Sequence, residues 1–165
     1  MANSLSRTGK DIAEVYNRHR DMIYRVCFAY MKNCTDTEDI IQESFCRLLT
    51  AQVNFENAEH EKAWLIRTAI NLCKNNLRNW WRKRENIEDH QSLQTRNEFE
   101  IDDTFKVVMS LPDKYKSVVY LYYYEGYDSV EISEILKKPQ STIRYFLSMA
   151  RKILREKLRG DFDEE

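Results

Sequence analysis

The chain has 165 residues, of which 42% are hydrophobic and 32% are charged, with only 3 glycines and 2 prolines. This composition fits one typical domain or two small ones of mostly helical structure, and it argues against sandwiches and barrels, which need many turns. No apolar run reaches the ~18 residues that a membrane-spanning helix needs, and the N-terminus lacks the apolar core of a signal peptide. We therefore expect no membrane insertion and a cytoplasmic location.

The net charge of −1 conceals a strong segregation of charge along the chain. Residues 62–84 carry seven bases and no acid, and residues 137–159 carry eight bases and one acid. Residues 85–103 between them carry seven acids and one base. Because patches rather than the total charge decide whether a polyanion binds, the two basic segments indicate two nucleic-acid-binding regions.

Apolar residues at helical spacing predict a first helix over residues 11–31. A second helix is predicted to end near Thr50, and Thr35, followed three residues later by Glu38, has the pattern of a capping box at its start. Its buried face is expected to consist of Ile41, Phe45, Leu48 and Leu49.

The second helix also carries a polar, mostly acidic stripe. Asp39, Gln42, Glu43 and Cys46 follow one another at positions i, i+3, i+4 and i+7. Glu43 and Arg47 are four residues apart, so they could be a plain surface pair worth about 0.2–0.5 kcal/mol. A surface pair does not explain why Asp39 and Gln42 share the stripe.

A third, long helix is predicted over about residues 59–84, with the loop AQVNFENA before it. Its polar side combines bases with four asparagines, at positions 71, 75, 76 and 79. Because asparagine is a mediocre helix former, helix propensity does not account for four of them. A nucleic-acid-binding surface does account for them: the amides would bind nucleobases, and the neighbouring cations would hold phosphates. Trp64, Trp80 and Trp81 could stack on unpaired bases or belong to the helical core. The apolar face is expected to contain Ile66, Ile70, Cys73, Leu77 and Trp80 or Trp81.

The C-terminal part has the layout of a helix-turn-helix after the acidic segment. Pro112 predicts the start of a helix that ends near Tyr124. A capping box of Asp128 and Glu131 then opens a short helix over about 129–137, and a last helix runs from about Gln140 to Arg159. The expected buried residues of the last two helices are Val130, Ile132, Ile135, Leu136, Ile143, Leu147, Ala150 and Leu154. The opposite face of the last helix offers Gln140, Ser141, Arg144, Tyr145, Ser148 and Arg151 to base edges and phosphates.

Three segments in this order resemble bacterial RNA polymerase sigma factors of the extracytoplasmic-function (ECF) group. DTEDIIQESFCRLL is similar to the family's region 2 signature, and AWLIRTAINLCKNNLR resembles the helix that engages the minus-ten element. The segment that begins LPDKYKSVV and ends with the helix-turn-helix resembles region 4. The resemblance covers about residues 11–159 and implies an all-α protein of two small helical domains, region 2 (11–84) and region 4 (104–159), joined by a flexible acidic linker (85–103).

The resemblance implies a sigma factor that binds core RNA polymerase, directs it to specific promoters and helps to open DNA. Asp39, Gln42 and Glu43 would contact the clamp helices of the polymerase's largest subunit. The loop Val53–Glu59 would capture a flipped base of the minus-ten element. The minus-ten residues would be Asn54, Phe55, Asn57, Trp64, Arg67, Asn71, Lys74, Asn75 and Arg78. The minus-thirty-five residues would be Gln140, Ser141, Thr142, Arg144, Tyr145, Ser148 and Arg151. Such proteins are typically held inactive by an anti-sigma factor.

Two features depart from the family pattern. The family often has glycine in the turn of the helix-turn-helix, where this chain has Lys137-Lys138-Pro139. Two positions of the recognition helix that are commonly arginine are Phe146 and Met149. These replacements suggest a non-standard minus-thirty-five sequence.

Two other classes of protein compete with this interpretation. A stand-alone helix-turn-helix regulator would bind duplex DNA by itself, but it needs neither the acidic stripe nor an amide-rich strand-opening helix. An enzyme would need a metal site, a phosphate loop or an activated nucleophile, and His60-Glu61 lacks the second histidine of a zinc motif. The cysteines form no C-x-x-C pair. We expect no catalytic residue, no metal and no cofactor.

Overall fold

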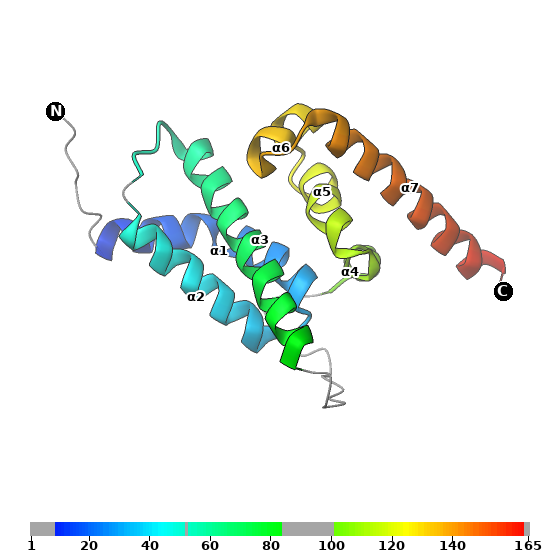
Figure 1. The fold of residues 1–165 in the computed structure, drawn as a ribbon, viewed down its shortest axis with the longest axis horizontal. Coiled ribbons are helices and arrows are strands. Elements are labelled where there is room, and N and C mark those ends of the chain that lie inside the picture. The colour runs from blue at the N-terminus through cyan, green and yellow to red at the C-terminus, as the bar shows by residue number, and fades with distance from the viewer. Residues whose placement is uncertain (1–8, 52, 84–100, 164–165) are drawn as a thin grey trace. The chain divides into compact units, whose positions relative to one another are not determined.

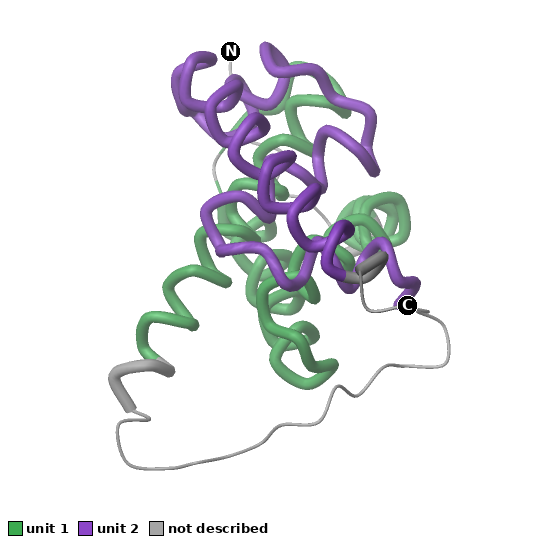
Figure 2. Tube along the Cα trace, turned by 90° about the vertical axis from the view of Figure 1, so that its right-hand side faces the viewer, with its two compact units in different colours: residues 1–99 green, residues 100–165 purple. Residues whose placement is uncertain are grey.

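The computed structural model describes residues 9–51, 53–83 and 101–163, and their side chains within 11–51, 53–79 and 101–160. The chain divides into two compact units, Met1–Phe99 and Glu100–Glu165 (Figure 2). The described residues form α-helices and no strand, which confirms the all-α prediction. Residues 85–100 of the predicted linker and the side chains of Trp80 and Trp81 lie outside the described part.

The first unit is a bundle of three helices, α1 (Gly9–Met31), α2 (Cys34–Thr50) and α3 (Ala58–Lys83). Each helix packs against the other two, and α2 and α3 run in opposite directions (Figure 1). All three helices contribute buried apolar side chains to one core. Among these are Ile23, Val26, Phe28, Ile40, Phe45, Leu48, Leu65, Ile66 and Ile70.

The chain turns from α1 to α2 within two residues. Lys32 has a left-handed backbone (φ 63°), which ends α1, and Asn33 caps α2. The Asn33 side chain accepts a hydrogen bond from the Asp36 amide and donates one to Oδ2 of Asp36, both at 2.8 Å. The prediction of Thr35 as the N-cap was wrong, because this reciprocal pair already satisfies the first turn and leaves Thr35 inside the helix.

The buried face of α2 was predicted correctly except at its end. Ile41, Phe45 and Leu48 are buried, and Ile40 and Ser44 complete the face. Leu49 is 49% exposed, so its predicted burial was wrong. At about 100° of rotation per residue, Leu49 lies roughly 110° from the centre of the buried face.

The second unit contains α4 (Asp103–Ser110), α5 (Asp113–Tyr123), α6 (Ser129–Leu136) and α7 (Gln140–Asp163). α5 begins directly after Pro112, as predicted, whereas α4 was not predicted. The carboxylate of Asp102 caps α4 by accepting a 2.7 Å hydrogen bond from the Phe105 amide. α7 continues one turn beyond the predicted end.

The two helices of the helix-turn-helix are α6 and α7. Asp128 and Glu131 form the predicted capping box, with hydrogen bonds of 2.8 and 3.0 Å. Ile132 and Ile135 of α6 and Ile143, Leu147 and Ala150 of α7 are buried as expected. Val130 is 46% exposed, so its predicted burial was wrong: it lies in the first turn of α6, ahead of the buried pair. The expected core residues Leu136 and Leu154, like Leu77 in α3, are half-buried.

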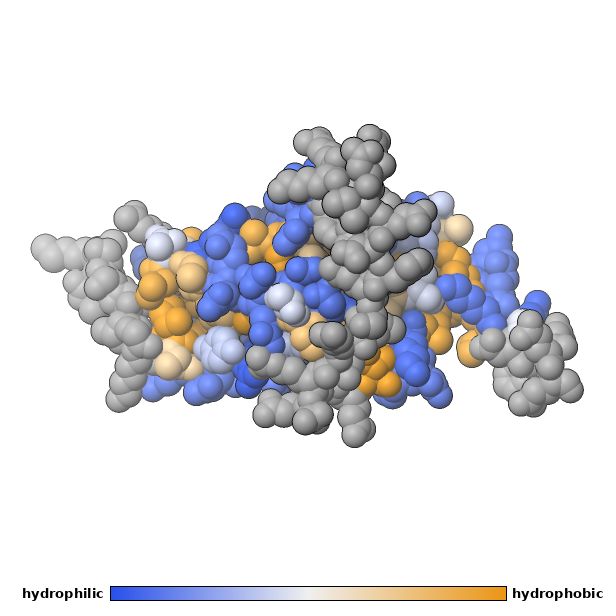
Figure 3. All heavy atoms as spheres, turned by 90° about the horizontal axis from the view of Figure 1, so that it is seen from below, coloured by the Kyte–Doolittle hydropathy of each residue, from blue (hydrophilic) through white to orange (hydrophobic). Residues whose placement is uncertain are grey.

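The face drawn in Figure 3 carries both hydrophilic and hydrophobic residues. Within the described ranges, no helix has both the length and the apolar character needed to cross a membrane. Large apolar side chains that are exposed include Tyr123 and Tyr145, both of which belong to the second unit.

Candidate polymerase and nucleic-acid interfaces

The polar stripe of α2 is exposed. Asp39, Gln42 and Glu43 all present their side chains to solvent on the side opposite the core. Glu43 accepts a hydrogen bond from Nε of Arg47 at 3.1 Å, so the surface pair exists. Both side chains are about half exposed, and such a pair contributes little to stability.

A small cavity adjoins the stripe between α1 and α2. It has a volume of about 210 Å³, and Asp39 and Gln42 are among the residues that line it. Arg20 lies over the ring of Tyr16, at 5.8 Å from the ring centre. The remaining lining residues are Tyr24, Glu38 and Ile41. The stripe therefore combines exposed carboxylates with a hollow that has aromatic walls.

The residues predicted to contact the minus-ten element on α3 share one face. At about 100° per residue, their positions span only about 100° of the helix circumference. The buried face, which includes Ile66 and Ile70, lies on the opposite side. Asn71, Asn75 and Arg78 are exposed, and Arg78 donates a hydrogen bond to Oδ1 of Asn75. The half-buried members of this face are Trp64, Arg67 and Lys74.

The loop before α3 is held against the first two turns of the helix. Asn57 caps α3, because its side-chain oxygen accepts a 2.9 Å hydrogen bond from the His60 amide. Nδ1 of His60 accepts a 3.3 Å hydrogen bond from the Glu56 amide. Phe55 packs edge-on against both His60 and Trp64, with ring centres 5.2 and 5.9 Å apart. Asn54 is exposed.

The sequence interpretation did not identify His60 as part of this site. It considered His60 only as half of a failed zinc motif. A signal was available in the spacing, because His60 precedes Trp64 by four residues and so lies on the same face of α3.

The face of α7 that is predicted to recognise DNA is exposed at four of its seven predicted residues. Ser141, Arg144, Tyr145 and Ser148 face solvent, on the side opposite Ile143. Thr142 and Gln140 are half-buried. Gln140 donates a 3.3 Å hydrogen bond to the hydroxyl of Ser129, which ties the start of α7 to the start of α6.

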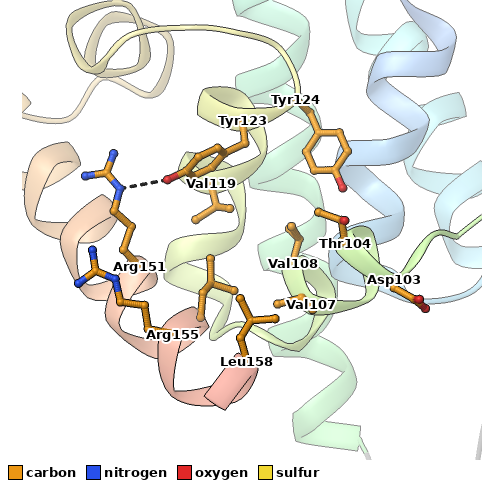
Figure 4. A pocket seen from close by; sticks show the side chains of 11 residues that line it. Asp103, Thr104, Val107, Val108, Val119, Tyr123, Tyr124, Arg151, Arg155 and Leu158 are labelled. Atoms are coloured by element: carbon orange, nitrogen blue, oxygen red, sulfur yellow. Dashed lines mark hydrogen bonds between the residues drawn. The ribbon is translucent and has the colours of Figure 1, made fainter. Parts of the chain in front are cut away.

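Arg151 is held by two tyrosines at the end of α5. Its Nε donates a 3.0 Å hydrogen bond to the hydroxyl of Tyr123 (Figure 4). Its guanidinium also lies over the ring of Tyr122, at 5.5 Å from the ring centre. The hydrogen bond to Tyr123 raises the pKa of Arg151 above its ordinary value. These two contacts restrict the orientation of the Arg151 side chain.

Phe146 and Met149 do not face the recognition side. Both pack against the core of the second unit, and Phe146 meets Tyr115 edge-on, with ring centres 5.4 Å apart. Nζ of Lys138 lies 6.0 Å from the ring centre of Phe146. Phe146 and Met149 therefore contribute to folding. The cation that lies over the Phe146 ring is Lys138, which comes from the turn.

A largely apolar groove of about 920 Å³ lies among α4, α5 and α7 (Figure 4). Val107, Val108 and Leu158 line its apolar part, while Arg151 and Arg155 line it from α7. Arg151 thus borders both this groove and the recognition face.

Two buried polar groups lie in the first unit outside the predicted site. Nε2 of His19 lies 3.4 Å from Oε1 of Glu61, and Arg18 approaches the same oxygen at 3.3 Å. Burial lowers the pKa of His19, which the Glu61 carboxylate partly opposes. Burial, together with the neighbouring thiol of Cys73, raises the pKa of Cys27 well above its ordinary value.

Metal-ligating residues do not gather in the described part of the chain. Over residues 9–51, 53–83 and 101–163, no group of three or more His, Cys, Asp or Glu side chains could hold a metal ion.

Comparison with known families matches both units. The family model described as Sigma-70 region 2 matches residues 15–84, and that described as Sigma-70, region 4 matches residues 106–154. The chain belongs to the sigma-70 family of bacterial RNA polymerase sigma factors, and its relatives place it in the ECF group.

Two relatives come from Bacillus subtilis (strain 168). The chain is 28% identical to the ECF RNA polymerase sigma factor SigW, over 90% of this chain and 88% of the relative. It is 31% identical to the RNA polymerase sigma factor SigV, over 85% of this chain and 86% of the relative.

A solved structure shares the fold. It is the sigma factor RpoE in complex with the anti-sigma factor NepR from Bartonella quintana, with a TM-score of 0.73 and 19% identity. The match covers 91% of this chain and 98% of that chain.

Proposed function

We propose that this sigma factor binds core RNA polymerase through the exposed stripe of α2 and recognises promoters through α3 and α7. The observation that carries the proposal is the exposed face of α3. There, asparagine amides and basic side chains lie beside a loop that is fixed by aromatic contacts. This is the chemistry that an unpaired DNA strand requires: cations for phosphates, amides for base edges and aromatic rings for stacking.

Asp39, Gln42 and Glu43 dock on basic side chains of the clamp helices in the largest polymerase subunit. Carboxylates pair most strongly with arginine when the contact excludes water. The Glu43–Arg47 pair is exposed and weak, so Glu43 can exchange Arg47 for a partner at little cost.

The α3 face and the loop before it open the minus-ten element. Flipping a base out of the stack costs a few kcal/mol. Stacking against an aromatic ring offsets about 1–3 kcal/mol of this cost, and phosphate contacts contribute further. Phe55 and Trp64 supply the rings, and Arg67, Lys74 and Arg78 supply the cations.

α7 reads the minus-thirty-five element in the major groove. Arg144 and Tyr145 lie near its N-terminal end, where a recognition helix meets base edges. Arg151 lies two turns further along, where it binds a phosphate. Arg144 and Arg151 of α7 thus contact the same DNA duplex.

The protein has no chemistry of its own, because sigma factors are initiation factors rather than catalysts. It acts in the cytoplasm with polymerase, and an anti-sigma factor restrains it by covering these same surfaces. The solved sigma factor with the same fold is in complex with an anti-sigma factor.

Fluorescence anisotropy of a labelled promoter duplex tests this function against that of a stand-alone regulator. The chain alone, core polymerase alone and the two together are titrated against the same DNA. A sigma factor gives specific binding only with both proteins present. Tight specific binding by the chain alone would favour the regulator.

A further inference from the structure

We propose that His60 is a positioning residue that sets the conformation of the loop before α3, and through it the base preference at the minus-ten element. The inference rests on the proposed function, because it assumes that this loop meets the opened strand. The residues involved are Phe55, Glu56, Asn57, His60 and Trp64.

His60 joins the loop to the DNA-facing side of α3 by two contacts. Its Nδ1 accepts a 3.3 Å hydrogen bond from the Glu56 amide, so its ring proton is on Nε2. Its ring meets Phe55 edge-on, at 5.2 Å and 90°. One side chain therefore fixes both the backbone and the aromatic ring of the loop.

The position of His60 directs these contacts toward the opened strand. His60 lies four residues before Trp64, so both belong to the same exposed face of α3. Phe55 touches both rings and is half-buried between them. Without His60, Phe55 loses one ring contact while its contact with Trp64 remains, and Glu56 loses the acceptor for its amide.

The Asn57 cap does not replace this function. Asn57 accepts a hydrogen bond from the His60 backbone amide, which every substitution at position 60 except proline retains. Substitutions at His60 therefore leave the start of α3 capped and change only the loop. Because the His60 side chain is exposed, they should not unfold the bundle.

Two isosteric substitutions separate positioning from direct DNA contact. Asparagine places an acceptor near the position of Nδ1, whereas glutamine places its amide near the position of Nε2. His60→Phe keeps a ring beside Phe55 but has no acceptor, and His60→Ala has neither. If His60 positions the loop, His60→Asn retains function; if it contacts DNA through Nε2, His60→Gln does.

The test is transcription by core polymerase with the full-length chain on a promoter library randomised at the minus-ten element. We expect His60→Asn to keep most of the wild-type base preference, because it restores the acceptor for the Glu56 amide although it lacks the ring. In His60→Ala and His60→Gln, the preference for one base over the others at one minus-ten position should fall roughly fivefold, the equivalent of one hydrogen bond. His60→Phe should lose an intermediate amount.

Three results would overturn the proposal. Unchanged preference in all four variants would mean that the loop does not depend on His60. A uniform loss across the library without a change in preference would assign His60 to general affinity. Retention by His60→Gln but not by His60→Asn would assign a direct contact. Failure of the wild-type protein to direct initiation would instead contradict the proposed function, so the two failures are distinguishable.

Discussion

Nε of Arg151 donates a 3.0 Å hydrogen bond to the hydroxyl of Tyr123, which joins the middle of α7 to the end of α5. Tyr123 is 53% exposed, so the bond lies at the surface. Arg151 also stacks over Tyr122. A long, flexible side chain is thereby restricted, which reduces the entropy that it would lose on binding the phosphate we propose as its partner.

Removal of the Tyr123 hydroxyl should weaken promoter binding by the holoenzyme. We expect Tyr123→Phe to reduce affinity for minus-thirty-five DNA about two- to fivefold, the effect of one modest hydrogen bond. Arg151→Ala should reduce it further and also lower the salt dependence, because one phosphate contact is lost. Anisotropy titrations at several salt concentrations measure both effects.

A double-mutant cycle provides the control for this pair. In the Arg151→Ala background, Tyr123→Phe should have no additional effect, because the hydroxyl then has no guanidinium to orient. Additive losses would show that Tyr123 acts independently of Arg151.

Charge reversal on the stripe of α2 should abolish polymerase binding. Asp39→Arg combined with Glu43→Arg replaces two exposed carboxylates by cations that repel a basic partner. Unfolding stability should change by less than about 1 kcal/mol, because only an exposed pair is lost. Co-elution with core polymerase and circular dichroism measure the two properties.

The matched control reverses two exposed acids of α1, with Glu14→Arg and Asp21→Arg. This variant has the same total charge and should still bind. Normal co-elution of the Asp39/Glu43 variant would exclude the stripe as the docking surface.

Lys137 should be replaceable by glycine with a gain in stability. Its backbone is left-handed (φ 52°), and the Lys138 amide closes the turn by a 3.1 Å hydrogen bond to the Ser133 carbonyl. This conformation costs a residue with a Cβ about 1–2 kcal/mol, and the greater chain entropy of glycine offsets part of the gain. We expect Lys137→Gly to stabilise the protein by about 0.5–1 kcal/mol in urea denaturation.

Lys138→Gly is the control, because Lys138 does not have a positive φ. That substitution should destabilise the protein slightly. A loss of stability in Lys137→Gly equal to that in Lys138→Gly would contradict the assignment of backbone strain to Lys137.

Because of His19, the first unit should be less stable at mildly acidic pH than at neutral pH. Burial lowers the pKa of His19, although Glu61 opposes the effect, while Arg18 and Lys62 add to it. The unfolded chain therefore takes up a proton at this histidine more readily than the folded protein does as the pH falls through about 6.5. Stability should be constant with respect to this group above that pH and should fall as the pH decreases below it.

Urea denaturation between pH 7.5 and 5.5 measures this dependence. Relative to wild type, His19→Gln should have a shallower slope, and the difference cannot exceed about 1.4 kcal/mol per pH unit for one proton. Identical slopes would mean that His19 titrates alike in the folded and unfolded states.

The periodic parts of the fold were predictable from sequence because they depend on residues within the same helix. The buried positions of α2 and α7 and the capping box at Asp128 are of this kind. α4 was missed because it has only eight residues and, unlike the equally short α6, no Glu or Gln follows its N-cap Asp102 by three residues to form a capping box. Phe146 and Met149 were interpreted as replacements of arginines. Phe146 follows Ile143 by three residues, so counting places it near the core side, whereas Met149 lies about 100° from Ala150 and its packing against the core is seen only in the structure.

Contacts between a loop and a helix left no periodic signal. Asn33 and Thr35 are both good N-caps, and only the Asn33–Asp36 hydrogen bonds decide between them. His60 could be placed on the face of α3 by counting, but its bond to Glu56 depends on how the loop folds back. The orientation of Arg151 depends likewise on Tyr123, from another helix.

The most direct measurement is transcription in vitro from fragmented genomic DNA of the source organism, by core polymerase with and without this protein. We expect new transcripts that start downstream of a shared two-part motif only when the protein is present. No new start sites, together with specific DNA binding by the protein alone, would contradict its function as a sigma factor.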